Sequence, residues 1–114
     1  MSENLPVVFQ DGSVAVDASG SSDPIRNKHA EKGIFRLDIT AATALTTLDV
    51  DIEWQEPGTG AWITLFSFTQ QVAVGSEAIV YGDIVADEFL PGNLRASWAL
   101  VGTDVTFTVV ADMR

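Results

Sequence analysis

Three carboxylates alternate along one stretch of the chain, at Asp49, Asp51 and Glu53. Oxygen ligands of this kind bind Ca²⁺, which takes about six to eight of them. On a strand, however, alternate side chains point outward side by side and do not surround an ion. The chain also lacks the D-x-D-x-D-G loop whose closely spaced oxygens wrap around calcium. We therefore expect no metal site, and these acids predict a solvated strand face or a surface for a basic partner.

Residues suited to acid–base or nucleophilic catalysis are few. His29 lies in a polar segment, without the nucleophile and the buried orienting acid that a triad requires. Asp87 and Glu88 are adjacent, and adjacent side chains on a strand diverge. The chain has no cysteine, and it has no glycine-rich phosphate loop followed by Lys and Ser or Thr. We expect no catalytic residues, no cofactor and no enzyme activity.

Three tryptophans offer flat aromatic faces of the kind that stack on sugars, at Trp54, Trp62 and Trp98. In the apolar–polar alternation of their strands, Trp54 and Trp98 fall on the same face as nearby aliphatic side chains, and this position predicts burial. Trp62 directly follows a turn and is the tryptophan that we expect to be exposed. Binding of a host glycan at Trp62 is therefore the alternative to core packing of all three rings.

The basic residues are concentrated in one part of an otherwise acidic chain. Within eleven residues lie Arg26, Lys28, Lys32 and Arg36, with His29 among them. A solvated linker explains such a cluster. A basic arm that lies across the acidic face of a neighbouring subunit or a scaffold protein explains it equally well.

The 114 residues and the 46% hydrophobic composition predict one domain with a substantial core. The sequence has no stretch of about 18 or more apolar residues, and its start lacks the basic and apolar regions of a secretory leader. We therefore expect the chain to be made and kept in the cytoplasm, or in a particle assembled there. Sixteen acidic against six basic residues give a net charge of −10, which argues against binding to nucleic acid or an anionic membrane.

Residues 1–32 differ in composition from the rest and predict an extended N-terminal arm. They contain two short apolar runs, and residues 17–32 are rich in Ser, Gly, Pro and charge. Such a segment buries too little apolar surface to offset the entropy of ordering. We therefore expect it to become ordered only when a partner holds it.

Residues 33–114 alternate with a period of two, which predicts an antiparallel β domain. The clearest case is the run from Leu48 to Phe68, where apolar and acidic residues alternate into the Pro/Gly turn EPGTG. A second, more apolar strand leaves this turn, so the run predicts a β-hairpin. The segments AATALT and GTD are predicted to be turns between further strands. About seven to eight such strands are typical of an antiparallel β-sandwich or jelly roll.

Four segments, in this order, resemble small virion proteins of tailed bacteriophages: GIFRLDITAA, LDVDIEWQEPGTGAWITLFSF, LPGNLRASWALVG and TDVTFTVVADM. In that family a strand of the form lDvTa, a hairpin dpasGkW, a strand LP..lRv.w and a last strand sFt..v recur. The resemblance covers residues 33–113 and leaves the N-terminal arm outside.

The resemblance implies a structural protein of the virion, and we expect a capsid decoration (cement) protein on the outside of the head. Its partners would be the major capsid protein and sister subunits in a homotrimer. We expect subunit contacts at Trp62, Leu65 and Phe66, and partner contacts at Phe9, Arg26, Lys28, His29 and Lys32. The alternatives are a tail or baseplate component of a phage, and a carbohydrate-binding module.

Overall fold

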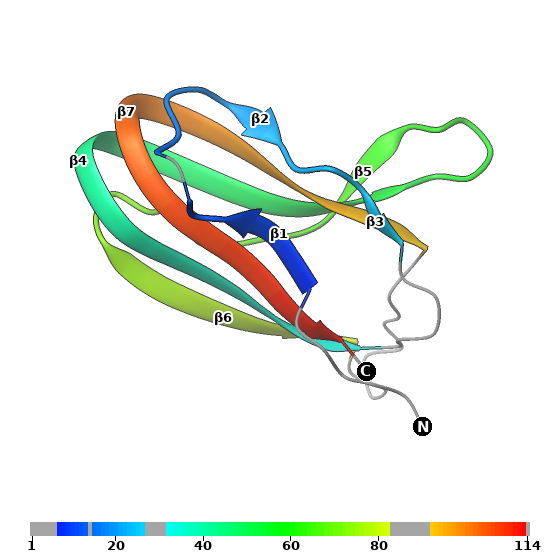
Figure 1. The fold of residues 1–114 in the computed structure, drawn as a ribbon. Helices are drawn as coiled ribbons and strands as arrows, with labels where there is room; N and C mark the ends of the chain where they lie inside the picture. The colour runs from blue at the N-terminus through cyan, green and yellow to red at the C-terminus, as the bar shows by residue number, and fades with distance from the viewer. Residues whose placement is uncertain (1–6, 14, 27–31, 83–91, 114) are drawn as a thin grey trace.

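The computed structural model describes residues 7–13, 15–26, 32–82 and 92–113 (Figure 1). The described residues contain β-strands, turns and connecting segments, and no helix among them is long and apolar enough to cross a membrane. The strands are β1 (Val7–Asp11), β2 (Gly20–Ser21), β3 (Ile25–Arg26), β4 (Gly33–Gln55), β5 (Trp62–Ser67), β6 (Gly75–Tyr81) and β7 (Asn93–Met113). The prediction of an all-β fold is confirmed.

The two long strands β4 and β7 form the centre of one antiparallel sheet. They pair along almost their whole length, from Gly33 opposite Met113 to Trp54 opposite Leu94. Along the other side of β7, the strands β1, β2 and β3 pair one after another. Along the other side of β4, β5 pairs with its C-terminal part and β6 with its N-terminal part. All described strands thus belong to one sheet, in place of the separate sheets of a sandwich.

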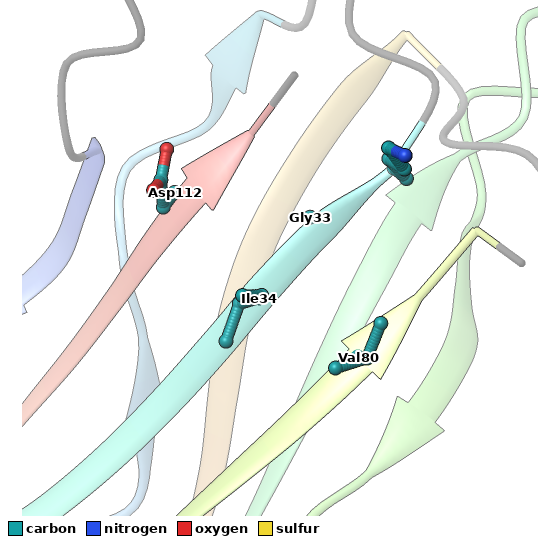
Figure 2. A pocket seen from close by; sticks show the side chains of 5 residues that line it. Gly33, Ile34, Val80 and Asp112 are labelled. Carbon is teal, nitrogen blue, oxygen red and sulfur yellow. The ribbon is translucent and has the colours of Figure 1, made fainter.

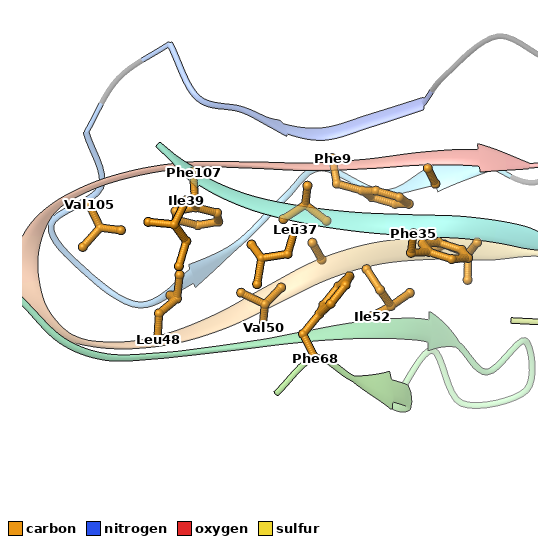
Figure 3. Packing of buried hydrophobic residues seen from close by; sticks show 14 residues of the cluster. Phe9, Phe35, Leu37, Ile39, Leu48, Val50, Ile52, Phe68, Val105 and Phe107 are labelled. Atoms are coloured by element: carbon orange, nitrogen blue, oxygen red, sulfur yellow. The ribbon is translucent and has the colours of Figure 1, made fainter. Parts of the chain in front are cut away.

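The β4–β7 pair bends near its middle and folds over, so that the sheet forms two facing halves (Figures 1 and 3). Its register shifts twice there, between Ile39 and Ala41 and between Leu45 and Thr47. Such bulges add a residue on one strand and bend it. On β7, Gly102 has a φ of 118°, and a Cβ there would collide with the carbonyl oxygen of Ala44. Glycine therefore lets the two backbones approach closely at the bend.

This bend corrects the prediction that AATALT and GTD are turns between separate strands. Both segments lie within continuous strands, because β4 and β7 remain paired through the bend. The buried positions of β4 are odd before the bend, as at Phe35 and Leu37, and even after it, as at Val50 and Ile52. A change of parity within a continuous strand has the same appearance in the sequence as a turn between two strands.

The hydrophobic core lies between the two halves of the sheet (Figure 3). The alternation predicted for both parts of β4 is confirmed, since Phe35, Leu37 and Ile39 are buried on one half and Leu48, Val50 and Ile52 on the other. Side chains of β7, β1 and the segment after β5 complete it, at Leu94, Ala96, Val105, Phe107, Val109, Ala111, Phe9 and Phe68. The predicted hairpin is confirmed as well, because Gln55 pairs with Trp62 across the turn.

The described part of the expected N-terminal arm lies along β7. Val7–Asp11 pairs with Thr108–Ala111, Val16 bridges Val105, and Ile25 pairs with Leu94. Side chains of the polar stretch add bonds to β7, because the Ser22 hydroxyl accepts a hydrogen bond from the backbone N–H of Ala96. In this structure, residues 7–13 and 15–26 therefore form the outer rim of the sheet, unlike an arm that is ordered only by a partner.

Candidate functional site

The acidic row lies on the outer face of the sheet, at Asp49, Asp51 and Glu53, with their neighbours Val50 and Ile52 pointing into the core. Asp49 accepts a 3.0 Å hydrogen bond from the Gln70 amide, and Glu53 pairs with Arg95. In the described part of the chain, no three His, Asp or Glu residues are placed to hold a metal ion. The row is a partly solvated strand face, on which Asp49 bonds to the segment after β5 and Glu53 bonds to β7.

Trp62 lies on the same outer face, at the start of β5. The Arg95 guanidinium carbon is 4.2 Å from the Trp62 ring centroid, and its Nε donates a 2.7 Å hydrogen bond to Glu53. Trp62 is half-buried, and the guanidinium covers one face of its ring. Trp54 and Trp98 are also half-buried and pack against the core, as their alternation predicts. The three rings therefore present no shared exposed platform for a sugar.

The basic cluster is placed only in part by the described residues. Arg26 is exposed at the end of β3, and Lys32 is exposed just before β4. Arg36 lies on the outer face of β4, where its Nε is 2.9 Å from an oxygen of Asp38. Lys28 and His29 lie outside the described residues, as do Asp87 and Glu88. Contact of Arg26 and Lys32 with a partner stays a prediction.

Phe9 differs from the expectation that it contacts another protein. It is 7% exposed, and its ring stacks on Phe35 with the centroids 6.2 Å apart. A register shift between Val8 and Gln10 interrupts the pairing of β1 with β7 around Phe9. The sequence pattern did not show that this short apolar run supplies part of the core.

Leu65 and Phe66, expected at a subunit contact, are half-buried on β5. The β4–β5 register shifts after Ile52, which leaves Leu65 as an additional residue on β5. Phe66 packs against rings of its own chain, with centroid distances of 4.9 Å to Phe35 and 5.2 Å to Tyr81. An interior contact therefore accounts for Phe66, while contact of Trp62 and Leu65 with a sister subunit stays a prediction.

One rim of the curled sheet is almost free of charge. It consists of residues 62–81, which run along β4 as β5, a connecting segment and β6, and we call it the apolar edge. Among its twenty residues Glu77 is the only charged one. Four of the seven large hydrophobic residues that are exposed in the described part of the chain lie here: Ile63, Val72, Val74 and Val80. Val72, Val74 and Val80 are more than 60% exposed.

The opposite rim has a different character. Residues 7–26, along β7, include four charged residues, Asp11, Asp17, Asp23 and Arg26. Charged side chains on an outer strand oppose pairing with another chain, and an uncharged strand does not. The two rims of the sheet therefore differ in their number of charged side chains, which influences whether an outer strand pairs with another chain.

The one charge of the apolar edge is bonded within its own chain. Glu77 accepts hydrogen bonds from the backbone N–H of Thr69 at 2.8 Å and from its hydroxyl at 3.0 Å. These bonds tie β6 to the segment that follows β5, and they hold the carboxylate close to the protein surface. The outer face of β6 is left with Ser76, Ala78 and Val80.

A small hollow lies beside the end of β6, with a volume of about 230 Å³ (Figure 2). Ile34 and Val80 are paired across β4 and β6, and they supply its apolar surface. Gly33, Lys32 and Asp112 complete the lining. The hollow extends the exposed apolar surface from β6 onto β4.

The sequence contains a signal for the apolar edge. In a chain with 19% charged residues, a run of twenty would hold about four charges, and residues 62–81 hold one. Alternation in the sequence indicates only the first part of this edge, the apolar strand that leaves the EPGTG turn. Val72, Val74 and Val80 were missed because their exposure depends on which strand is outermost.

Exposed apolar side chains beside an outer strand equip this rim to bind another protein through backbone hydrogen bonds and apolar contact. No family model, no curated protein and no solved structure matches the chain. Among the described residues, the features that set this rim apart are its exposed apolar side chains and its outer strands.

Proposed function

We propose that this protein is a structural component of a virus particle, and specifically a capsid decoration protein on the head of a tailed bacteriophage. The observation that supports a role in assembly is the apolar edge, which has four exposed large hydrophobic side chains in a protein of net charge −10. Exposed apolar side chains gathered along one rim of a sheet favour protein association there. The assignment to a phage head rests on the resemblance of residues 33–113 to small virion proteins.

The charge distribution supports this role. A net charge of −10 favours solubility of the free protein before it reaches a particle. The row at Asp49, Asp51 and Glu53 faces outward on the sheet, where it stays wet or meets a basic partner. The apolar edge, with Glu77 as its one charged residue, is then the surface on which association is least opposed. We propose the major capsid protein and sister copies as its partners.

The location on a particle is tested by immunogold electron microscopy of phage from the host that carries this gene. We expect the label on the heads of purified particles. A label confined to tails would overturn the decoration role in favour of the tail or baseplate alternative. Purified particles that lack the protein would overturn a virion role altogether.

The role of the apolar edge is tested by adding purified chain to particles from a phage with this gene deleted. The double variant Val72→Lys and Val74→Lys places two charges on the edge, outside the strands. We expect the amount that sediments with particles to fall at least tenfold. Val101→Lys, at an exposed valine on the bend of β7, is the matched control and should sediment as wild type. Equal sedimentation of both variants would show that another surface binds the particle.

A further inference from the structure

β6 is the most regular outer strand of the sheet. Its seven residues pair with β4 without a register shift, from Ile39 opposite Gly75 to Gly33 opposite Tyr81. β1 and β5 each contain a register shift, and β2 and β3 have two residues each. In Figure 1, β6 follows the lower rim of the sheet with no strand beyond it. Its pairings in the described part of the chain are with β4 only.

β6 also lacks the features that keep outer strands from pairing. Proteins protect such strands with lysine, proline, bulges or short length. The sequence GSEAIVY contains no lysine or proline, and its register shows no bulge. Its one acid, Glu77, is bonded to Thr69. Backbone donors and acceptors along β6 are therefore presented without a charged side chain of β6 on the outer face. The charges beside them belong to β4, where Arg36 pairs with Asp38 and also contacts the Ser76 hydroxyl.

We propose that β6 pairs with β6 of a second copy of this chain, antiparallel about a twofold axis, so that one sheet continues through the dimer. This inference deepens the proposed function, because it names the sister copy as the partner of the apolar edge. Each copy has a net charge of −10, so two copies repel wherever acidic surfaces meet. Pairing β6 with itself joins two strands whose one charged side chain, Glu77, is already bonded within its own chain.

Charge and length fix the register of this pair. An axis at Glu77 would place two carboxylates directly opposite each other, which destabilises a strand pair. An axis at Ala78, the midpoint of β6, pairs all seven residues of each strand, with Gly75 opposite Tyr81. Ala78 then faces Ala78 of the second copy, and Val80 faces Ser76 across the same outer face.

A threefold ring, as the resemblance implies, would require β6 to pair with a different strand of the next copy. The free strand at the other rim of the same half is β1, which ends in Asp11 beside the acids of residues 7–26. In such a ring, the acidic residues beside β1 would be covered by β6, which has no Lys or Arg to pair with them. The charge of the two rims therefore favours the twofold pair.

Disulfide trapping tests the register, because the chain has no cysteine of its own. Residues directly opposite in an antiparallel pair have Cα atoms about 4.5 to 5.5 Å apart, within the range of a disulfide. We expect Ala78→Cys to form a covalent dimer under mild oxidation at high yield. Ala99→Cys, at an exposed alanine of β7 that pairs with Asp49 of the central strand β4, is the matched control and should remain at least tenfold less cross-linked. Equal cross-linking of the two variants would overturn the register.

The mass of the unmodified protein tests the dimer itself. A single strand pair is a small interface and binds weakly. In sedimentation equilibrium the mass should therefore rise with protein concentration and reach twice the mass of one chain by about 0.5 mM. Val80→Lys should reduce the mass to that of one chain, and Val101→Lys should leave it at two. Circular dichroism checks that both variants fold. A monomer at every concentration, or a trimer, would overturn the proposal.

These results are independent of the particle experiments. If the purified protein is a monomer but the immunogold label lies on phage heads, the dimer is overturned and the decoration role stays intact. A dimer that is missing from purified particles would do the reverse.

Discussion

Phe9 stacks on Phe35 with ring centroids 6.2 Å apart, and this contact joins the N-terminal segment to the core. Phe35 is completely buried on β4, and Phe9 comes from the outer strand β1. The contact changes what a truncation would do. Removing residues 1–32 would take away Phe9 and the strands that pair with β7, so we expect the shortened chain to be destabilised.

Phe9→Ala should lower the free energy of unfolding by about 3 kcal/mol, because it removes a buried ring and leaves a cavity. The measurement is urea denaturation followed by circular dichroism. Val8→Ala is the matched control on the same strand, with a side chain that is 49% exposed, and should cost less than about 1 kcal/mol. Equal costs would show that β1 does not pack on the core.

Gly102→Ala should lower the free energy of unfolding by about 2 kcal/mol or more, because strained backbone and a collision with Ala44 combine at this site. Thermal and urea denaturation measure the loss. Gly58→Ala, in the β4–β5 turn, has ordinary φ and its nearest contact is 3.9 Å away, so it should be close to neutral. A stable Gly102→Ala variant would show that the bend tolerates a side chain.

Arg95→Met should cost about 1 to 2 kcal/mol, between the values typical of exposed and buried ion pairs. The change removes both the bond to Glu53 and the contact with the Trp62 ring, while it keeps an apolar stem. Arg36→Met is the control, because the Arg36 side chain is 51% exposed and its pair with Asp38 should contribute at most about 0.5 kcal/mol. Urea denaturation compares the two, and the same loss in both variants would contradict the structural role of Arg95.

The pKa of Asp11 is held below its ordinary value by hydrogen bonds from Ser13, first from its backbone N–H at 2.9 Å and second from its hydroxyl at 2.8 Å. A lowered pKa means that the charged form is favoured in the folded state. The stabilisation is therefore present above the ordinary pKa and is lost as the pH falls through the folded pKa. Ser13→Ala should raise the pKa part of the way, as measured by NMR titration of the side-chain carboxyl carbon. An unchanged midpoint would exclude the hydroxyl bond.

Self-association of the chain should strengthen with salt. Two copies of net charge −10 repel at long range, and ions screen this repulsion, while apolar contact and backbone bonds between β6 strands are screened little. We expect the dimer dissociation constant to fall several-fold as NaCl rises from about 0.02 M to 0.2 M, a range over which screening changes strongly. Sedimentation velocity provides the measurement. Weaker association at high salt would indicate that ion pairs hold the copies together.

Local alternation was sufficient to predict several strands from the sequence. Phe35, Leu37 and Ile39 face the core because successive strand side chains point to opposite sides, whatever the partner strand is. The turn between Gln55 and Trp62 was predictable for the same reason, since Pro and Gly favour a turn locally. These features depend on residues close together in the chain.

The bend and the core position of Phe9 were not predictable in this way. A bulge such as the one between Ile39 and Ala41 exists only relative to the opposite strand, so the sequence of β4 alone does not show it. Phe9 is buried because β1 pairs with β7, about 100 residues away in the chain. In both cases the partner strand, and not the local sequence, sets the structure.

The sequence by itself determined that the chain is all-β, strongly acidic as a whole and almost free of charge from residue 62 to residue 81. Only the tertiary structure decided that these uncharged residues form one rim of the sheet and that Val72, Val74 and Val80 are exposed there. Apolar–polar alternation along a strand indicates which residues can face a core, because backbone geometry points successive side chains to opposite faces. Whether a strand is central or outermost depends on which segments lie beside it, and distant contacts decide that.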